Sequence, residues 1–350
     1  MDKLAIVILN YNGRGFLEKF LPGVVQYADN HPVYVADNGS TDDSMTVLRA
    51  DFPTVRLIEL TANNGYAGGY NAALDVVQNQ FGGAMYYCLL NSDVEVTPGW
   101  IAPILAVLDN NPCVAACQPK IRDYNRRDYF EHAGAAGGYL DWLGYVFCRG
   151  RVFATFERDS GQYDDNRAVF WATGACLFVR AAVFHQTGGF DAAFFAHMEE
   201  IDWCWRAQRA GYQVWACGHS VVYHVGGGTL PKANPHKTYL NYRNSLFMLY
   251  KNWPADGWLW PKIILRLVLD GLSSILFLKV GQWQDVVAIL RAHVAFYGHL
   301  PMLIRQRRNL WQVQKQTVPL IGLSVVWAYF KEGKKTFGEL LTEVPSRLRS

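Results

Sequence analysis

The stretch Cys88-Leu-Leu-Asn91-Ser92-Asp93-Val-Glu95-Val decides the fold. It continues a hydrophobic segment that begins at Ala84, and this pattern predicts a strand over 84–90 that runs directly into Asn91 and Asp93. The Asp93 carboxylate is therefore expected where a buried sheet edge meets solvent. Such a carboxylate can hold a divalent metal, Mg²⁺ or Mn²⁺, which also binds phosphate oxygens. A lone aspartate at a strand end is more often structural, so this assignment needs support from the rest of the chain.

The first 120 residues alternate between strand and helix patterns. Strands are predicted over 4–9, 32–36, 55–60 and 84–90, and helices over 16–26, 43–50 and 70–79. This βαβαβαβ series predicts a parallel sheet with helices on both faces. In such a sheet the ligand site lies at the carboxyl ends of the strands.

Polar segments occupy the predicted strand ends, namely Asn10-Tyr11-Asn12-Gly13, Asp37-Asn38-Gly39-Ser40 and Asn63-Asn64-Gly65-Tyr66-Ala67-Gly68-Gly69. Tyr11 can stack on a nucleobase, and Asp37 can accept a hydrogen bond from a base or a ribose. Gly65 and Gly68 allow close backbone approach to a ligand and open a helix N-terminus toward phosphate. The first turn lacks the GxGxxG fingerprint, which disfavours a nicotinamide-dependent enzyme.

Met198-Glu199-Glu200-Ile201-Asp202 places three carboxylates just ahead of an apolar helix predicted over 199–210. A carboxylate crowded by others has a raised pKa, which suits a general base. Two alternatives stay open: these acids interact with the helix dipole, or Asp202 pairs with Arg206 one turn later. His224 ends a predicted strand before a glycine-rich loop, where it can complete a metal shell or serve a structural role.

The middle of the chain is less regular. Residues 131–150 are rich in glycine and aromatic residues, which is typical of a loop or hairpin lining a cleft. Further strands are predicted over 114–119, 170–178, 214–216 and 221–224, with helices over 103–110 and 181–186.

The C-terminal region differs from the rest in charge and hydropathy. Residues 255–350 contain 13 Lys/Arg and 6 Asp/Glu, a net charge of +7, whereas the remainder contains 20 and 24, a net charge of −4. A basic, apolar region suggests peripheral contact with an anionic membrane leaflet, the alternative being a solvated helical face. The apolar segment 263–280 includes Arg266, Asp270 and Lys279, and 318–330 is short, so we expect helices that lie on a membrane or pack on the body rather than cross.

The cysteine pattern indicates a reducing compartment. The seven cysteines include no CxxC pair, and the N-terminus lacks the pattern of a secretory signal. We therefore expect a cytoplasmic protein at the inner face of the membrane. Nothing in the sequence indicates a nucleic-acid partner.

Six motifs together resemble the family 2 glycosyltransferases, the inverting class with a GT-A fold. In order they are VILNYNG, ADNGSTDDS, NNGYAGGYN, LLNSDVEVTPGW, FFAHMEEIDWCWRAQRAGY and VYHVGGGT, over about residues 3–250. The resemblance implies an α/β GT-A domain over 1–250, with a Rossmann-like, mostly parallel sheet, and a helical C-terminal extension over 251–350. It also implies a UDP- or dTDP-sugar donor, a divalent metal, and transfer to a glycan or polyprenyl-linked acceptor in cell-surface polysaccharide assembly.

The resemblance also assigns residues by position. The donor nucleotide is expected to contact Tyr11, Asn12, Asp37, Asn63, Gly65, Gly68, Asn71 and Ser92. Asp93 matches the metal-binding carboxylate of the DxD motif, and His224 matches a histidine that joins the metal. Asn91 stands where many members carry Asp, a form similar to a rhamnosyl- and galactofuranosyltransferase-like branch.

The acidic motif matches the family's Glu-Asp pair, whose second member is the base. This implies Glu200 as the base, with Glu199 and Asp202 as further candidates. Tyr242-Arg243-Asn244 resembles a recurrent element that follows the catalytic domain and has no assigned role.

Two other classes of protein remain as alternatives. A nucleotidyltransferase would share the metal and the nucleotide pocket, but it requires a basic, glycine-rich signature near the first strand. A non-catalytic sugar-nucleotide-binding scaffold would keep the fold and lose the acids, whereas Asp93 and Glu200 are both present.

Overall fold

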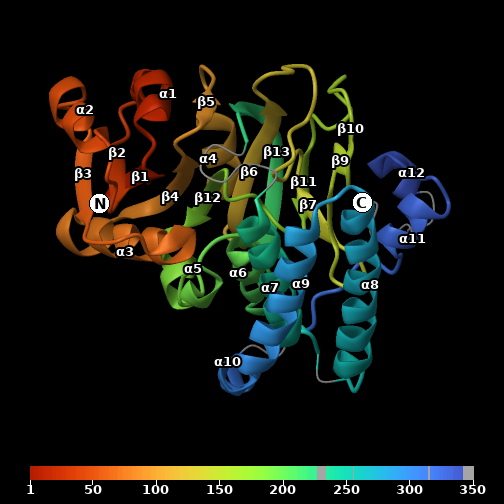
Figure 1. Cartoon of the computed structure of the whole chain (residues 1–350). Helices are drawn as coiled ribbons and strands as arrows, with labels where there is room; N and C mark the ends of the chain where they lie inside the picture. Colours follow the sequence, from red (N-terminus) through yellow and green to blue (C-terminus); the bar gives the residue numbers. More distant parts are fainter. Residues whose placement is uncertain (227–233, 255, 314–315, 342–350) are drawn as a thin grey trace.

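A mixed sheet forms the centre of the computed structural model, which describes residues 1–226, 234–254, 256–313 and 316–341. Its strands follow the order β11-β13-β6-β12-β4-β1-β2-β3, and β5 pairs with β13 (Figure 1). The strands are β1 (Asp2–Asn10), β2 (Val33–Asn38), β3 (Arg56–Leu60), β4 (Ala84–Asn91), β5 (Val94–Val96), β6 (Val114–Asp123), β11 (Asn166–Val169), β12 (Cys176–Arg180) and β13 (Gln213–His224). Strands β3, β2, β1 and β4 are mutually parallel, whereas β12 is antiparallel to both β4 and β6. The predicted α/β fold with a mostly parallel sheet is confirmed.

Helices cover both faces of this sheet because its strands alternate between two cores. In β1, Leu4 and Ile6 point into one core while Ala5 and Val7 point into the other. Helices on the first face are α1 (Arg14–Gln26), α2 (Ser44–Asp51) and α4 (Ala102–Asn110); those on the second are α3 (Gly65–Gln80), α5 (Ala181–Gln186) and α6 (Glu199–Arg209).

The central strand β4 ends at Asn91, at the edge of the sheet where the polar segments lie. From Tyr86 to Leu90 it is buried on both faces, which explains its continuous apolar run. Its register places Asn91 beside Leu9 of β1. The polar segments that follow β1, β2 and β4 therefore gather at one edge of the sheet.

Several boundaries differ from the predicted ones. Helix α3 begins at Gly65 rather than 70, so Gly68 belongs to its first turns. The two strands predicted over 214–216 and 221–224 form one strand, β13, because a register shift between Cys217 and Val221 lets it continue along β6. Strand β12 begins only at Cys176, which leaves 170–175 to border the cleft described below.

The predicted glycine- and aromatic-rich segment forms a hairpin in a second, smaller sheet. This sheet has the order β10-β9-β8-β7, and its strands are β7 (Gly138–Leu140), β8 (Val146–Cys148), β9 (Arg151–Val152) and β10 (Thr155–Phe156).

The C-terminal helices belong to the buried cluster on the second face of the main sheet. They are α7 (Pro235–Asn252), α8 (Leu259–Lys279), α9 (Trp283–Gly298), α10 (Leu300–Val313), α11 (Val325–Phe330) and α12 (Phe337–Leu341). Helix α7 contacts α6 as well as α8 and α9 (Figure 1). Leu246, Ile263 and Phe296 belong to the same buried cluster as Ala5 of the central sheet, so these helices share one of its two cores.

No single helix in the described ranges is long and apolar enough to cross a bilayer; α9 and α10 pass that test only as a pair, bent by 61°. The end of the VYHVGGGT motif, residues 227–229, and the chain terminus 342–350 lie outside the described residues.

Candidate active site

A cleft of about 630 Å³ opens at the carboxyl ends of β1, β2 and β4. This volume lies within the range of about 300–1,000 Å³ that is usual for small-ligand sites. The residues around it that bear on its chemistry are Tyr11, Asn38, Asn63, Gly65, Tyr66, Asn91, Ser92, Asp93, Glu131, Glu199, Glu200, His224, His236, Lys237, Thr238 and Asn241. Asp93, Glu200 and His224, which are far apart in sequence, therefore face one common space.

Asp93 and His224 are brought together by strand pairing. Strand β5 runs antiparallel to β13 with His224 opposite Val94, which puts the imidazole beside the preceding residue, Asp93. Nε2 of His224 lies 3.1 Å from Oδ1 of Asp93, and Nδ1 lies 3.1 Å from Oε2 of Glu131. All three side chains are buried. Glu131 thus fixes the orientation of the ring that faces Asp93.

The two carboxylates outweigh the single imidazole in charge. Burial disfavours the protonated ring, yet Asp93 and Glu131 together raise the pKa of His224 to about 10. Burial also opposes ionisation of Glu131, but its hydrogen bond to His224 lowers its pKa to about 2. The cluster is therefore a buried site of net negative charge with one proton on the nitrogen that faces Asp93.

The donor set at this point fits a hard divalent cation that takes its other ligands from outside the protein. Among the described residues, no group of three or more His, Cys, Asp or Glu side chains is arranged to hold a metal alone. Asp93 supplies a carboxylate oxygen and His224 a ring nitrogen, and a cation can replace the proton on Nε2. Glu131 behind the ring matches the carboxylate–histidine arrangement that supports metal-bound imidazoles. The remaining ligands would come from water or a diphosphate.

Glu199 and Glu200 stand in the first turn of α6 with oxygens that lack partners. Oε2 of each carboxyl is buried and makes no hydrogen bond within the described part of the chain. Burial raises the pKa of Glu200 to about 7, and burial together with the Glu200 charge raises the pKa of Glu199 well above its usual range. Both carboxyls line the cleft, so either can accept a proton from a bound hydroxyl.

The loop before α6 is held in an unfavourable backbone conformation. Phe195, His197 and Met198 have positive φ angles of 63°, 71° and 72°, which cost energy for residues other than glycine. Gly65, with φ of 68°, is packed so closely here that an added Cβ would lie 2.4 Å from the carbonyl oxygen of Phe195. The loop therefore needs external restraints.

Helix α7 supplies these restraints through two neighbouring side chains. Nδ2 of Asn244 lies within 2.7–2.9 Å of the carbonyl oxygens of Phe194, Ala196 and His197. Arg243 donates from Nη2 to the carbonyl of Phe194 at 3.0 Å and from Nε to Oδ1 of Asn244 at 2.9 Å. The Tyr-Arg-Asn element thus acquires a role that the sequence did not assign: it fixes the loop that leads into the acidic motif.

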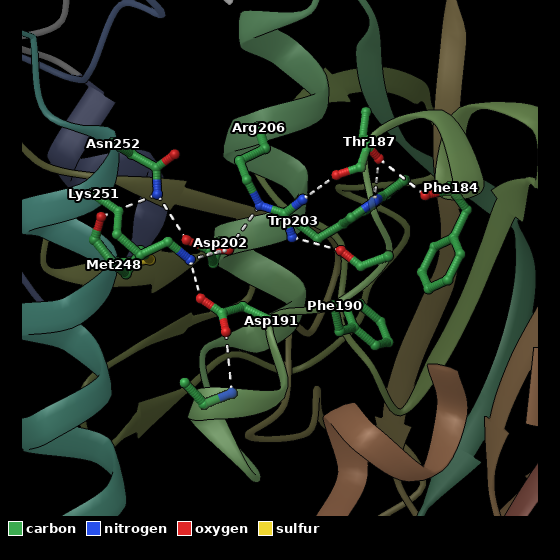
Figure 2. A network of polar contacts seen from close by, with 12 residues as sticks. Phe184, Thr187, Phe190, Asp191, Asp202, Trp203, Arg206, Met248, Lys251 and Asn252 are labelled. Carbon is green, nitrogen blue, oxygen red and sulfur yellow. Dashed lines mark hydrogen bonds and ion pairs between the residues drawn. The ribbon is translucent and has the colours of Figure 1, made fainter. Parts of the chain in front are cut away.

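The structure does not bring Asp202 to the cleft. Its fully buried carboxylate accepts hydrogen bonds from Arg206 at 2.8 Å, Lys251 at 3.1 Å and Asn252 at 2.8 Å (Figure 2). Lys251 also donates to Asp191 at 2.6 Å. The sequence left two structural interpretations of Asp202 open, and the structure shows the pair with Arg206. This pair belongs to a network that joins α6 to α7 and to the loop before α6.

Four of the expected donor residues border the cleft: Tyr11, Asn63, Gly65 and Ser92. Asn38, which ends β2, borders it too and was not selected from the sequence. Its amide donates to Oδ1 of Asn63 at 3.1 Å and to the carbonyl of Gly65 at 3.0 Å, which fixes the start of α3 beside the cleft.

The other four expected donor residues lie behind the cleft wall and hold its loops. Asp37 accepts hydrogen bonds from the Asn10 amide and the Ser40 backbone, and Asn12 accepts one from the backbone of Thr41. Asn71 makes two hydrogen bonds with the Phe190 backbone, and Gly68 packs on Asn64. None of the four borders the cleft.

Glu131 was missed from the sequence as well. It lies in an irregular segment 93 residues from His224, and no periodicity or motif marks it.

Solved structures with similar folds are glycosyltransferases. GalNAc-T7 with UDP, GalNAc and Mn²⁺ aligns over 99% of this chain with a TM-score of 0.60 and 12% identity, and the chain spans 58% of that structure. A mannosyltransferase from Pyrobaculum calidifontis in complex with GDP-Man and Mn²⁺ aligns over 84% of this chain and 87% of its own, with a TM-score of 0.52 and 16% identity. These likenesses define the fold of this chain as GT-A-like.

Sequence relatives are consistent with this class. An N-acetylglucosaminyl-diphospho-decaprenol L-rhamnosyltransferase of Mycobacterium tuberculosis H37Rv is 32% identical over 241 residues, which cover 65% of this chain and 78% of that protein. A low-salt glycan biosynthesis hexosyltransferase of Haloferax volcanii, Agl10, is 22% identical over 302 residues, covering 85% and 88%. The family model for glycosyl transferase family 2 matches residues 5–188, and the chain belongs to that family.

Proposed function

We propose that this glycosyltransferase moves a sugar, with inversion, from a UDP- or dTDP-sugar to a hydroxyl of a glycan or polyprenyl-linked acceptor in cell-surface polysaccharide assembly. The observation that carries the proposal is the meeting of Asp93, His224 and Glu200 in one cleft. The similarity to a rhamnosyltransferase whose name specifies a diphospho-decaprenol acceptor supports a lipid-linked acceptor. Within this proposal, 1–250 form the catalytic domain and 251–350 its helical extension.

On the donor side, Tyr11 and Asn63 border the base and ribose end of the cleft, and Ser92 lies beside Asp93. Gly65 and Tyr66, at the N-terminus of α3, also line the cleft, so the positive end of the helix dipole lies beside the same space. Asp37 and Asn12 serve the donor indirectly, since they hold the turn that carries Tyr11.

Asp93 and His224 would hold Mg²⁺ or Mn²⁺ against the donor diphosphate. When bound, the metal supplies Lewis-acid stabilisation of the negative charge on the departing nucleoside diphosphate. Glu131 keeps Nδ1 of His224 engaged, so that Nε2 faces the donor side.

Glu200 is the proposed base. Its free oxygen takes the proton of the acceptor hydroxyl while the hydroxyl oxygen forms a bond to the anomeric carbon. The bond from that carbon to the diphosphate oxygen breaks on the opposite side, so the anomeric configuration inverts. The clamp from Asn244 to the preceding loop sets the direction in which this carboxylate points.

The test is turnover of a panel of UDP- and dTDP-sugars with and without Mn²⁺, measured as release of nucleoside diphosphate. We expect metal-dependent release that Glu200→Gln and Asp93→Asn each abolish and that Asp51→Asn, an exposed change on α2, leaves intact. NMR of the glycosylated product gives its anomeric configuration, and retention would refute the single displacement.

The alternatives predict different outcomes of the same experiment. Pyrophosphate formation from a nucleoside triphosphate and a sugar phosphate would indicate a nucleotidyltransferase. Tight nucleotide binding without any turnover would indicate a scaffold.

The proposed setting is the cytoplasmic side of a membrane, with peripheral contact through the C-terminal helices. All seven cysteines are free and six of them are buried, which suits a reducing compartment. Fractionation of cells that express the full chain tests this placement.

A further inference from the structure

Helix α8 buries three of its four charged side chains and exposes most of its large apolar ones. Lys262, Arg266 and Asp270 are buried and point into the protein. The Lys262 amine donates to the carbonyl of Trp142 at 2.6 Å, Arg266 donates to that of Leu143 at 3.1 Å, and His293 lies 3.1 Å from Asp270. The opposite side exposes Ile264, Leu265, Val268, Leu272, Ile275, Leu276 and Leu278, each 36–58% accessible. This is the reverse of the usual amphipathic helix of a soluble protein.

Helix α9 repeats the pattern beside it. Asp285 is buried and accepts a hydrogen bond from Thr238 at 2.5 Å. The exposed side chains recur every three or four residues on one side: Trp283, Val287, Leu290, Val294 and Tyr297. The two helices lie against each other (Figure 1). We call these exposed apolar side chains of the two neighbouring helices the outer face; exposed apolar side chains in such number mark an interaction surface.

The charges around the outer face have one sign. Of the charged side chains on α8, α9 and α10, both acidic ones, Asp270 and Asp285, are buried. The exposed ones are all basic: Lys279, Arg291, Arg305 and Arg308. A second copy of this chain would present the same cations and repel them, whereas an anionic lipid surface complements both the apolar patch and the charge.

We propose that the outer face docks onto an anionic lipid bilayer and lies in its interface, with the two helices parallel to the membrane plane. Buried Lys262, Arg266 and Asp270 make this arrangement possible, because their hydrogen bonds inside the protein leave the lipid-facing side of α8 apolar.

The two helices that carry the outer face also lie next to the cleft on their inner side. Thr238, on α7, borders the cleft and is hydrogen-bonded to the first turn of α9. Tyr242, one turn further on, is 2.6 Å from Ser273 of α8. Lys237, beside His236, lines the same end of the cleft, where its positive charge suits an anionic headgroup. Docking therefore holds the end of the cleft that Thr238 borders near the membrane, which suits a lipid-linked acceptor, and this step rests on the proposed function.

The experiment is flotation of the full chain with vesicles of phosphatidylcholine alone or mixed with phosphatidylglycerol. We expect binding to the anionic vesicles that weakens with added salt, since its ionic part is screened. The variant Val268→Gln/Leu272→Gln/Val294→Gln should bind about a hundredfold more weakly, because it removes three lipid contacts. The control Met85→Gln changes a side chain of similar exposure at the start of β4 and should bind like the wild type.

Three results would overturn the assignment. They are no vesicle binding by the wild type, equal binding to neutral and anionic vesicles, and a dimer in solution that the triple variant dissociates without affecting vesicle binding. Metal-dependent hydrolysis of the donor in solution separates this inference from the proposed function. The triple variant should retain that hydrolysis, so loss of docking and loss of catalysis are distinguishable.

Discussion

Burial raises the pKa of the Glu200 carboxyl to about 7, which places its titration in the working range of a general base. The base acts only when ionised. We therefore expect kcat/KM for transfer to rise with pH through about 7 and then level off. Glu200→Gln should lower kcat by roughly 10²–10⁴-fold. Initial rates at saturating metal, measured across pH, check both statements.

The raised pKa of Glu200 also predicts how the stability of the protein depends on pH, and this dependence is an independent check on the assignment. Since the folded-state pKa is raised above the ordinary value of 4.5, ionisation of Glu200 costs stability. This cost is absent below about pH 4.5 and complete above about pH 7. Glu200→Gln should therefore melt higher than the wild type at alkaline pH and equally at acidic pH. An acidic limb of the rate profile near 4.5 would contradict the assignment of this residue.

Asp202 is two positions from Glu200, but the pKa of its carboxyl is lowered rather than raised. Although burial opposes its ionisation, Lys251 and Arg206 lower the pKa of this carboxyl (Figure 2). Asp202→Asn leaves two cations without their shared partner and should destabilise the fold by about 3–5 kcal/mol. The deficit should be complete above about pH 4 and shrink as the pH falls through the lowered folded-state pKa, since protonation removes the same interaction. Urea denaturation at several pH values measures it, and an unchanged midpoint would contradict the network.

At the scale of elements, the loop before α6 depends on α7. Asn244→Ala removes the donor that holds three loop carbonyls. We expect kcat to fall by about one to two orders of magnitude with little change in KM for the donor, because the base is misdirected while the nucleotide pocket stays intact. Asn244→Asp keeps the shape but cannot donate, so it should not restore kcat. A KM effect equal to the kcat effect would indicate general disorder of the site.

The elements differ in how well local sequence determines them. The first four strands and the helices between them were predictable, because each strand is a short apolar run and each helix shows helical spacing of its apolar residues. The start of α3 at Gly65 was not, since it depends on Phe195, which is distant in sequence but packs against this glycine. Likewise, Glu200 and Asp202 have different roles because Glu200 lines the cleft whereas Asp202 faces α7. Glu131 is positioned by its contact with His224. The site was predictable where a residue ends a strand and unpredictable where a partner far along the chain positions it.

At the scale of the whole molecule, one buried cluster runs from the central sheet through α7 to α8 and α9. Helix α7 lies at the centre of this cluster. It holds the loop before α6 through Asn244, borders the cleft through Thr238 and contacts α9 through the same residue. Catalytic geometry and the position of the outer face are therefore coupled through a single rigid element.

The melting temperature of the whole protein also tests whether the metal and the nucleotide bind together. Among the described residues, Asp93 and His224 are the direct ligands that we propose, and a diphosphate that contributes further oxygens should bind the metal more tightly than water does. We expect Mn²⁺ alone or UDP alone to raise the melting temperature little, and both together to raise it by more than the sum, because each ligand tightens the binding of the other and tighter binding stabilises the fold more. Asp93→Asn and His224→Gln should each remove the excess while leaving the response to UDP alone. Thermal shift measurements with Mn²⁺, UDP, dTDP and each pair check this, and a full shift with Mn²⁺ alone would mean that the protein holds the metal without the nucleotide.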